Sequence, residues 1–111
     1  MKYKLGDICY GRSGDKGENS NIGLIFLNQE LYNWAIDNIK EKDVKNFLKN
    51  IVKGKVIRYK LDNINALNFI LHDSLGGGGS DSLLNDAQGK THAQTLLMME
   101  IVLPKKLRRY I

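Results

Sequence analysis

The 111-residue sequence predicts a two-layer α+β sandwich in which helices cover one face of a mixed or antiparallel sheet of four to five strands. Three observations support this fold class. The length fits a single hydrophobic core, because two cores in a chain of this size would each be marginal. Short apolar segments typical of strands stand at both ends of the chain, and between them apolar residues recur at helical spacing. The sequence contains no internal repeat, so one domain is expected.

The first two strands are expected at residues 3–10 and 20–27, joined by a polar loop over residues 11–19. The second segment is almost wholly apolar, which is typical of a central strand covered on both faces. Its Gly23 favours a close approach of another backbone. These segments predict the first hairpin of the sheet.

Two helices are expected next, because the apolar residues of this region fall on two stripes that are out of phase by about a third of a turn. The stripes are Leu31, Trp34, Ala35 and Ile39, and then Val44, Phe47, Leu48 and Ile51. The break should fall at residues 40–43, where Asp43 caps the second helix. Gly54 is expected to end that helix in a left-handed conformation.

The second half of the chain predicts further strands and one further helix. Residues 55–61 alternate as a half-buried strand does, and residues 64–75 follow helical spacing, with a strand as the alternative for the same segment. Residues 82–86 and 90–103 are expected to pair as a hairpin through a turn at residues 86–89.

Most of the net charge of +5 lies at the C-terminus. The last seven residues include Lys105, Lys106, Arg108 and Arg109, which leaves the rest of the chain nearly neutral. Without a basic stripe or a nucleic-acid-binding motif in the body, no nucleic-acid partner is expected. We place the domain at residues 1–104 and a basic tail at residues 105–111, and we expect the tail to be solvated and frayed.

The sequence predicts a cytoplasmic protein without membrane contact. Its apolar runs of four or five residues are far shorter than the roughly 20 residues that span a bilayer, and no apolar segment follows the first lysines as in a secretory signal. The single Cys9 excludes an intrachain disulfide, and no set of ligands has the spacing of a metal site. We therefore expect no metal and no cofactor.

The strongest candidate binding site is the segment Arg12-Ser13-Gly14-Asp15-Lys16-Gly17. Its glycines let the backbone turn sharply with exposed amides, and Arg12 and Lys16 add positive charge, so the segment could hold a carboxylate or a phosphate. The spacing is not that of a P-loop. The alternative is a tight hairpin loop in which Asp15 bonds to its own turn and Lys16 lies in solvent.

A second candidate is the glycine run formed by Gly76, Gly77, Gly78 and Gly79. Four consecutive glycines indicate a hinge, or a place where a ligand or another backbone comes close. The run follows a predicted helix and so lacks the helix N-terminus that favours phosphate. Close packing or a subunit contact is therefore expected. His72 and His92 have no setting typical of a general base, and each is expected to be a surface or packed histidine.

Several blocks of the sequence resemble the ferredoxin-like C-terminal domain of the AtuA-like (acyclic terpene utilisation) proteins. They are Arg12 to Gly17 with Asn21-Ile22-Gly23, then Ala66-Leu67-Asn68-Phe69, Leu75 to Gly79 and Asp86 to Lys90, in that order. The resemblance covers about residues 4–104 and implies a ferredoxin-like fold. In that family the domain commonly follows a much larger N-terminal domain, and the group is associated with degradation of acyclic terpenes and branched acids as acyl-CoA thioesters.

The resemblance implies an accessory small subunit that partners a separately encoded large AtuA-type protein. Arg12, Lys16, Asn21 and the glycine run are the residues expected to contact that partner or an acyl-CoA. A homo-oligomer is also expected, because a domain without its neighbour keeps apolar surface exposed. The alternative is a small hydratase or lyase that acts on a CoA thioester, with Asp15 or a histidine as acid or base. No catalytic residue is assigned.

Overall fold

The computed structural model describes residues 2–16, 19–72 and 92–111. The strands and longer helices are β1 (Tyr3–Lys4), β2 (Cys9–Lys16), β3 (Asn19–Phe26), α1 (Gln29–Asn38), α2 (Glu41–Phe47), β4 (Val56–Leu61), β5 (Ala66–Leu71) and β6 (Glu100–Ile101). The 3-10 helices are η1 (Leu5–Asp7), η2 (Asp62–Ile64) and η4 (Lys105–Tyr110), and residues 92–96 are also helical.

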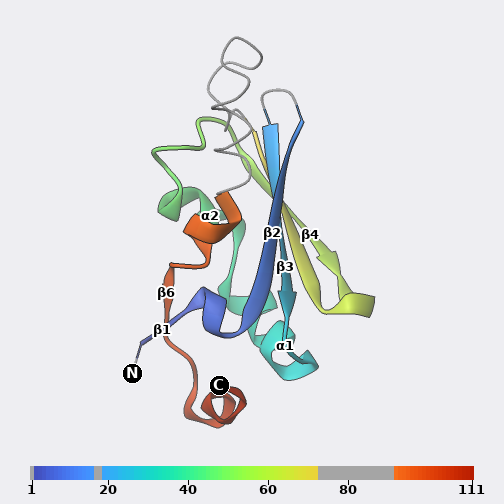
Figure 1. Cartoon of the computed structure of the whole chain (residues 1–111), viewed down its shortest axis with the longest axis vertical. Helices are drawn as coiled ribbons and strands as arrows, with labels where there is room; N and C mark the ends of the chain where they lie inside the picture. The colour runs from blue at the N-terminus through green and yellow to red at the C-terminus, as the bar shows by residue number, and fades with distance from the viewer. Residues whose placement is uncertain (1, 17–18, 73–91) are drawn as a thin grey trace.

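A four-stranded antiparallel sheet with the order β2-β3-β5-β4 forms the centre of the molecule. In Figure 1, α2 and the C-terminal segment lie to the left of β2, and α1 lies below the end of β3. A second, two-stranded sheet pairs β1 with β6. The predicted α+β class, with helices packed on a four-stranded antiparallel sheet, is therefore confirmed. No helix among the described residues is long and apolar enough to cross a membrane.

The predicted polar loop over residues 11–19 is wrong, because β2 continues to Lys16 and β3 begins at Asn19. Gly11 explains why a strand with so few apolar residues is stable here. It faces the core, where the side chain of Leu97 comes within 3.2 Å of the position that a Cβ would take. The missing side chain is therefore replaced by a leucine from the C-terminal segment. The predicted first strand is correspondingly displaced, since residues 5–7 form η1.

The predicted helix over residues 64–75 is also wrong, and the strand alternative describes β5. Leu67, Phe69 and Leu71 alternate with less buried residues, and all three are fully buried. β3 and β4 flank β5 and pair with its backbone on both sides. Asn65, at a φ of 55°, turns the chain from η2 into β5. Two-sided pairing therefore prevails over the local helical spacing.

Two helices are present as predicted, but the break falls at Ile39 and Lys40, at the start of the predicted range, and α2 ends at Phe47, before Leu48 and Ile51 of the predicted stripe. Asp43 does cap α2, but from inside its first turn, where its carboxylate accepts the Lys40 backbone N–H at 2.9 Å. A side chain of the sheet fixes the end of α1. Arg58 of β4 donates through Nη1 to the carbonyl oxygens of Ile36 and Ile39 at 2.9 and 2.8 Å. β4 thus fixes where α1 stops.

Gly54 does not end α2 as predicted, since that helix already ends at Phe47. The glycine instead allows a close approach of two chain segments. A Cβ at Gly54 would lie 2.8 Å from both the Cβ and the carbonyl oxygen of His72. The backbone N–H of Gly54 donates to that carbonyl at 2.9 Å. This contact extends the pairing of β4 and β5 by one step beyond the sheet.

The predicted C-terminal hairpin is wrong where the structure describes it. Residues 92–96 are helical, and Glu100–Ile101 pairs with β1 near the N-terminus instead of with a neighbouring segment. Residues 82–86 and the turn at residues 86–89 lie outside the described residues. Backbone bonds from Leu5 to Met99 and from Gly6 to Leu97 extend the β1–β6 contact.

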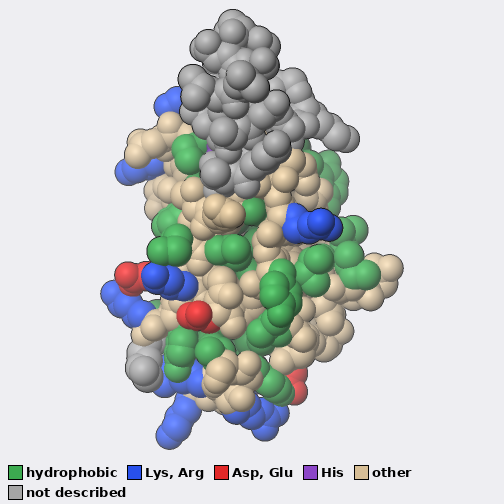
Figure 2. Space-filling model, viewed as in Figure 1, with side chains coloured by type: hydrophobic (Ala, Val, Ile, Leu, Met, Phe, Trp, Pro, Cys, Tyr) green, Lys and Arg blue, Asp and Glu red, His purple; other side chains and the backbone are tan. Residues whose placement is uncertain are grey.

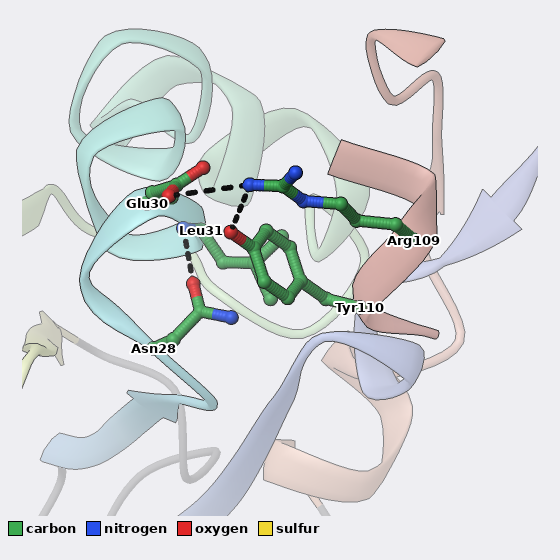
Figure 3. Close-up of polar contacts among 5 residues, drawn as sticks. All are labelled: Asn28, Glu30, Leu31, Arg109 and Tyr110. Carbon is green, nitrogen blue, oxygen red and sulfur yellow. Dashed lines mark hydrogen bonds and ion pairs between the residues drawn. The ribbon is translucent and has the colours of Figure 1, made fainter. Parts of the chain in front are cut away.

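The basic C-terminus is folded, so the expectation of a frayed tail is wrong. Residues Lys105–Tyr110 form η4, and the side chain of Leu107 joins the core. Arg109 lies 3.7 Å from Glu30 of α1 and donates to the Tyr110 hydroxyl at 2.8 Å (Figure 3). At the adjacent start of α1, the side chain of Asn28 accepts the backbone N–H of Leu31 at 2.9 Å. The last residues are therefore part of the helical layer.

Candidate functional site

In the part of the chain that the structure describes, the helices cover one face of the four-stranded sheet and leave the other uncovered. Buried side chains of the central strands point toward the helices, among them Ile22, Leu24, Leu67 and Phe69. The residues between them point to the other side, which we call the open face. Three rows of the open face cross all four strands: Tyr10, Ile25, Ala66 and Leu61; Arg12, Gly23, Asn68 and Tyr59; Gly14, Asn21, Ile70 and Ile57.

Large apolar side chains on the open face are exposed. The exposed fractions are 69% for Tyr10, 52% for Tyr59, 41% for Leu61 and 38% for Ile25. Figure 2 shows hydrophobic side chains gathered over the strands to the right of the molecule, with a basic side chain among them. A contiguous apolar area of this kind on a small domain is typical of an interaction surface.

The middle row gives the open face its polar centre. Arg12 on β2 and Asn68 on β5 flank Gly23 of β3. A Cβ at Gly23 would have no neighbour nearer than 4.0 Å, the distance to the carbonyl oxygen of Arg12 and to Asn68 Oδ1. Gly23 therefore leaves a recess that a side chain from another molecule could fill. This is the opposite of the predicted close approach to a neighbouring backbone.

A hollow of about 290 Å³ adjoins this row. Its described lining consists of Asn19, Ser20, Asn21, Asn68 and Ile70. Asn21 Nδ2 donates to Asn68 Oδ1 at 3.3 Å, which fixes the two amides side by side. A Cβ at Gly14 would lie 3.1 Å from Asn21 Oδ1, so a larger residue there would press on this pair. Amide donors and acceptors thus lie on the same face of the sheet as Arg12.

The structure brings together part of the predicted site. Arg12, Gly14 and Asn21 share the open face, whereas Ser13 lies on the opposite side of β2, across from Ile22. Asp15 and Lys16 belong to β2, and the positions of their side chains are not described. Gly17 and the run from Gly76 to Gly79 lie outside the described residues. The predicted anion loop is therefore replaced, as far as the structure describes it, by a strand that presents one exposed arginine.

Gly23, Asn68 and Tyr59 were not among the predicted site residues. The signal for Asn68 was its place between two strongly apolar neighbours, Leu67 and Phe69. An amide in the middle of an apolar strand has to point away from the core. The sequence reading assigned this segment to a helix, and so it missed that Asn68 and Arg12 lie on one face.

The order of these elements can now be compared with known proteins. The family model of the AtuA ferredoxin-like domain matches residues 3–102. The chain belongs to this family. No curated protein and no solved structure matches it significantly. The resemblance noted in the sequence is therefore confirmed, and with it the ferredoxin-like α+β fold.

The AtuA ferredoxin-like domain also contains a buried polar pair on the covered side of its sheet. Ser20 Oγ lies 3.0 Å from His92 Nδ1, and both side chains are almost fully buried. The pair ties the helical residues 92–96 to β3. His92 Nε2 has no hydrogen-bond partner among the described residues. Burial lowers the pKa of His92 below its ordinary value of 6.5, so the imidazole is neutral at pH 7.

This lowered pKa predicts a loss of stability in mild acid. The folded state disfavours protonated His92, so stability is complete above the unfolded pKa of about 6.5 and falls as the pH drops through that value toward the folded pKa. One such group contributes at most about 1.4 kcal/mol per pH unit. Chemical denaturation of the wild type should therefore depend more steeply on pH between about pH 7 and pH 5 than that of His92→Gln. Equal slopes would show that His92 is not a buried neutral group.

Cys9 is also part of the core, and the backbone of His72 holds the end of β5. The Cys9 thiol donates to the carbonyl of Leu5 at 3.3 Å, and burial raises its pKa to about 12. A thiol with so high a pKa is not a nucleophile at neutral pH. His72 forms backbone bonds with both Gly54 and Lys55 at the end of β5.

A groove on the helical side was not predicted from the sequence. Two adjoining hollows, of about 350 and about 280 Å³, share Trp34 and Asn38 of α1 and lie between α1 and the C-terminal segment. Acidic residues of the lining are Glu30, Asp37, Asp43 and Glu100. We call this the Trp34 groove. Lys106 also lines the groove, and Glu30 and Glu100 form ion pairs with Arg109 and Lys2. A half-buried tryptophan bordered by an exposed acid such as Asp37 is the kind of anchor that protein interfaces use.

Proposed function

We propose that this AtuA ferredoxin-like domain is a non-catalytic accessory subunit that binds a separately encoded large AtuA-type protein. We further propose that the complex serves the catabolism of acyl-CoA thioesters of acyclic terpenes or branched acids. One observation carries the accessory role. The thiol of Cys9 and the imidazole of His92 are sealed in the core and hydrogen-bonded there, whereas the accessible side chains lie on an open face and in an open groove.

The Trp34 groove is the surface that we assign to the large partner. Trp34 supplies an aromatic anchor, and Asp37 is an exposed acid beside it with no hydrogen bond or ion pair to another described residue. The complementary partner surface would present apolar groups bordered by basic side chains. Because the groove is shallow and open, it suits a protein segment better than an enclosed small molecule.

Co-purification tests this assignment. The tagged chain, co-expressed with a large AtuA-type protein encoded beside it, should retain that protein, and Asp37→Arg should weaken the complex by about tenfold or more through charge reversal. Asp37 lies at the end of α1, where a basic residue favours the helix dipole, so the variant should stay folded. Lys49→Glu, an exposed charge reversal outside the groove, is the matched control. Equal retention by Asp37→Arg would contradict the groove assignment.

The alternative is a small hydratase or lyase acting on a CoA thioester. The Ser20–His92 contact and the neutral imidazole are the observations that favour it. We expect the purified chain alone not to turn over acyl-CoA, because both side chains of that pair are excluded from solvent. Hydration or cleavage of an acyl-CoA that is abolished in a folded His92→Gln variant would establish the enzyme instead.

A further inference from the structure

We infer that the open face binds a second copy of this chain, face to face, about a two-fold axis that runs parallel to the strands between β3 and β5. This goes beyond the proposed function, which assigns the large partner to the Trp34 groove. The argument rests on the order of side chains in the three rows of the open face, because that order is complementary to itself.

The axis exchanges the two halves of the sheet. With the strand order β2-β3-β5-β4, rotation places β2 of one copy over β4 of the other, and β3 over β5. Each row of one copy then lies over the same row of the other copy, with the order of its four residues reversed. The facing pairs are Arg12 with Tyr59, Gly23 with Asn68, Tyr10 with Leu61, Ile25 with Ala66, Gly14 with Ile57, and Asn21 with Ile70.

Side-chain sizes match across this arrangement. Each of the three smallest residues of the open face lies over a larger one: Gly23 over Asn68, Gly14 over Ile57, and Ala66 over Ile25. The recess at Gly23, with no neighbour nearer than 4.0 Å to a Cβ, has room for the incoming amide. Small-to-large alternation of this kind lets two packed sheets interdigitate.

Charges match as well. Arg12 is the one charged residue among the described positions of the three rows, and the axis places it over the ring of Tyr59 of the second copy. An arginine over an aromatic face is attracted by the ring quadrupole. The two arginines of the dimer lie on opposite flanks, about 14 Å apart across three strand spacings, beyond a Debye length of about 8 Å. Within these three rows, self-association therefore does not bring like charges together.

The expected dimer is weak, because the face is small. Four strands of about six residues cover roughly 20 by 20 Å, less than the about 800 Å² per partner of standard interfaces. Sedimentation of the full chain should therefore show a monomer–dimer equilibrium in the micromolar range, between about 1 and about 500 µM. A monomer throughout that range would overturn the inference.

A charge-exchange cycle tests the pairing of Arg12 with Tyr59. Arg12→Glu and Tyr59→Lys should each weaken the dimer by about tenfold. In Arg12→Glu the new carboxylate lies over the ring of Tyr59 of the other copy, which repels it. In Tyr59→Lys the new ammonium lies over Arg12 of the other copy, so two cations face each other. The double variant places the new carboxylate over the new ammonium in both halves of the dimer. It should restore the dissociation constant to within about threefold of wild type. Losses that simply multiply in the double variant would show that these positions do not face each other.

Gly23→Val gives a second, independent test. The new side chain fits an open recess in the monomer, so its thermal melt should equal or exceed that of wild type, while the dimer should weaken by about tenfold or more. Lys60→Val is the matched control, because it adds the same residue to an exposed position of the neighbouring row and leaves the open face unchanged. Undiminished dimerisation of Gly23→Val would overturn the face-to-face arrangement.

Discussion

Replacing Phe69 with alanine is expected to lower the free energy of unfolding by about 3–5 kcal/mol, as found for large aromatic side chains removed from packed cores. Phe69 is fully buried in the central strand β5, between Ile22 of β3 and Arg58 of β4. Its removal leaves a cavity in the layer between sheet and helices, and a domain of this size has only about 5–15 kcal/mol of stability in total. Urea denaturation followed by circular dichroism measures the loss.

The matched control is the next residue of the same strand. Ile70 lies on the open face, so Ile70→Ala should cost less than about 1 kcal/mol. The two variants differ by one position along β5 and by the side of the sheet that they affect. If both cost the same, the open face is not a solvent-facing surface, and the arrangement of the sheet described above is wrong.

Arg58→Ala is expected to destabilise the domain by about 2–4 kcal/mol, because hydrogen bonds from a charged donor contribute more than neutral ones. Arg58 Nη1 bonds to two carbonyls at the end of α1, those of Ile36 and Ile39. Without the guanidinium, these carbonyls lose their partner at the point where the chain turns from α1 into α2. The thermal midpoint should fall, and α1 should lose protection at its C-terminal turn.

Two further variants separate the hydrogen bonds of Arg58 from its charge. Arg58→Lys keeps the charge but replaces the guanidinium with an ammonium on a flexible stem, so it should recover only part of the loss. Lys60→Ala removes an exposed cation two residues further along β4 and should change stability by less than about 0.5 kcal/mol. Full recovery by Arg58→Lys would show that the general field of the charge is what matters at the end of α1.

The fold class could be predicted from the sequence because its main signals are local. The apolar stripes beginning at Leu31 and Val44 each start in a different helix, and their phase difference predicted a break at residues 40–43, close to the observed one at Ile39 and Lys40. Residues 64–75 were assigned wrongly because their spacing is compatible with both periods. The segment forms a strand because β3 and β4 pair with it on both sides, and the pairing with β3 joins residues that are distant in sequence.

The candidate site was harder to predict, because its glycines have two opposite meanings. Gly14 and Gly23 suggested turning and close approach, but both lie in extended strands. Gly11 is small because Leu97, 86 positions later in the chain, occupies its space. No local pattern encodes such a contact. Arg12 could be singled out from the sequence as a candidate, whereas its neighbours across the sheet became visible only with the register of the strands.

The two outer strands of the sheet, β2 and β4, affect the resistance of the protein to aggregation. Among the described residues, β2 and β4 have no further strand beside them, so each presents unpaired backbone groups along one side. Sheets with such borders can grow into filaments by adding strands. Arg12 on β2 and Lys60 on β4 are exposed, place positive charge along both borders and repel the same borders of other molecules. Growth by strand addition is thereby opposed, and concentrated solutions should stay clear longer at low salt than at high salt.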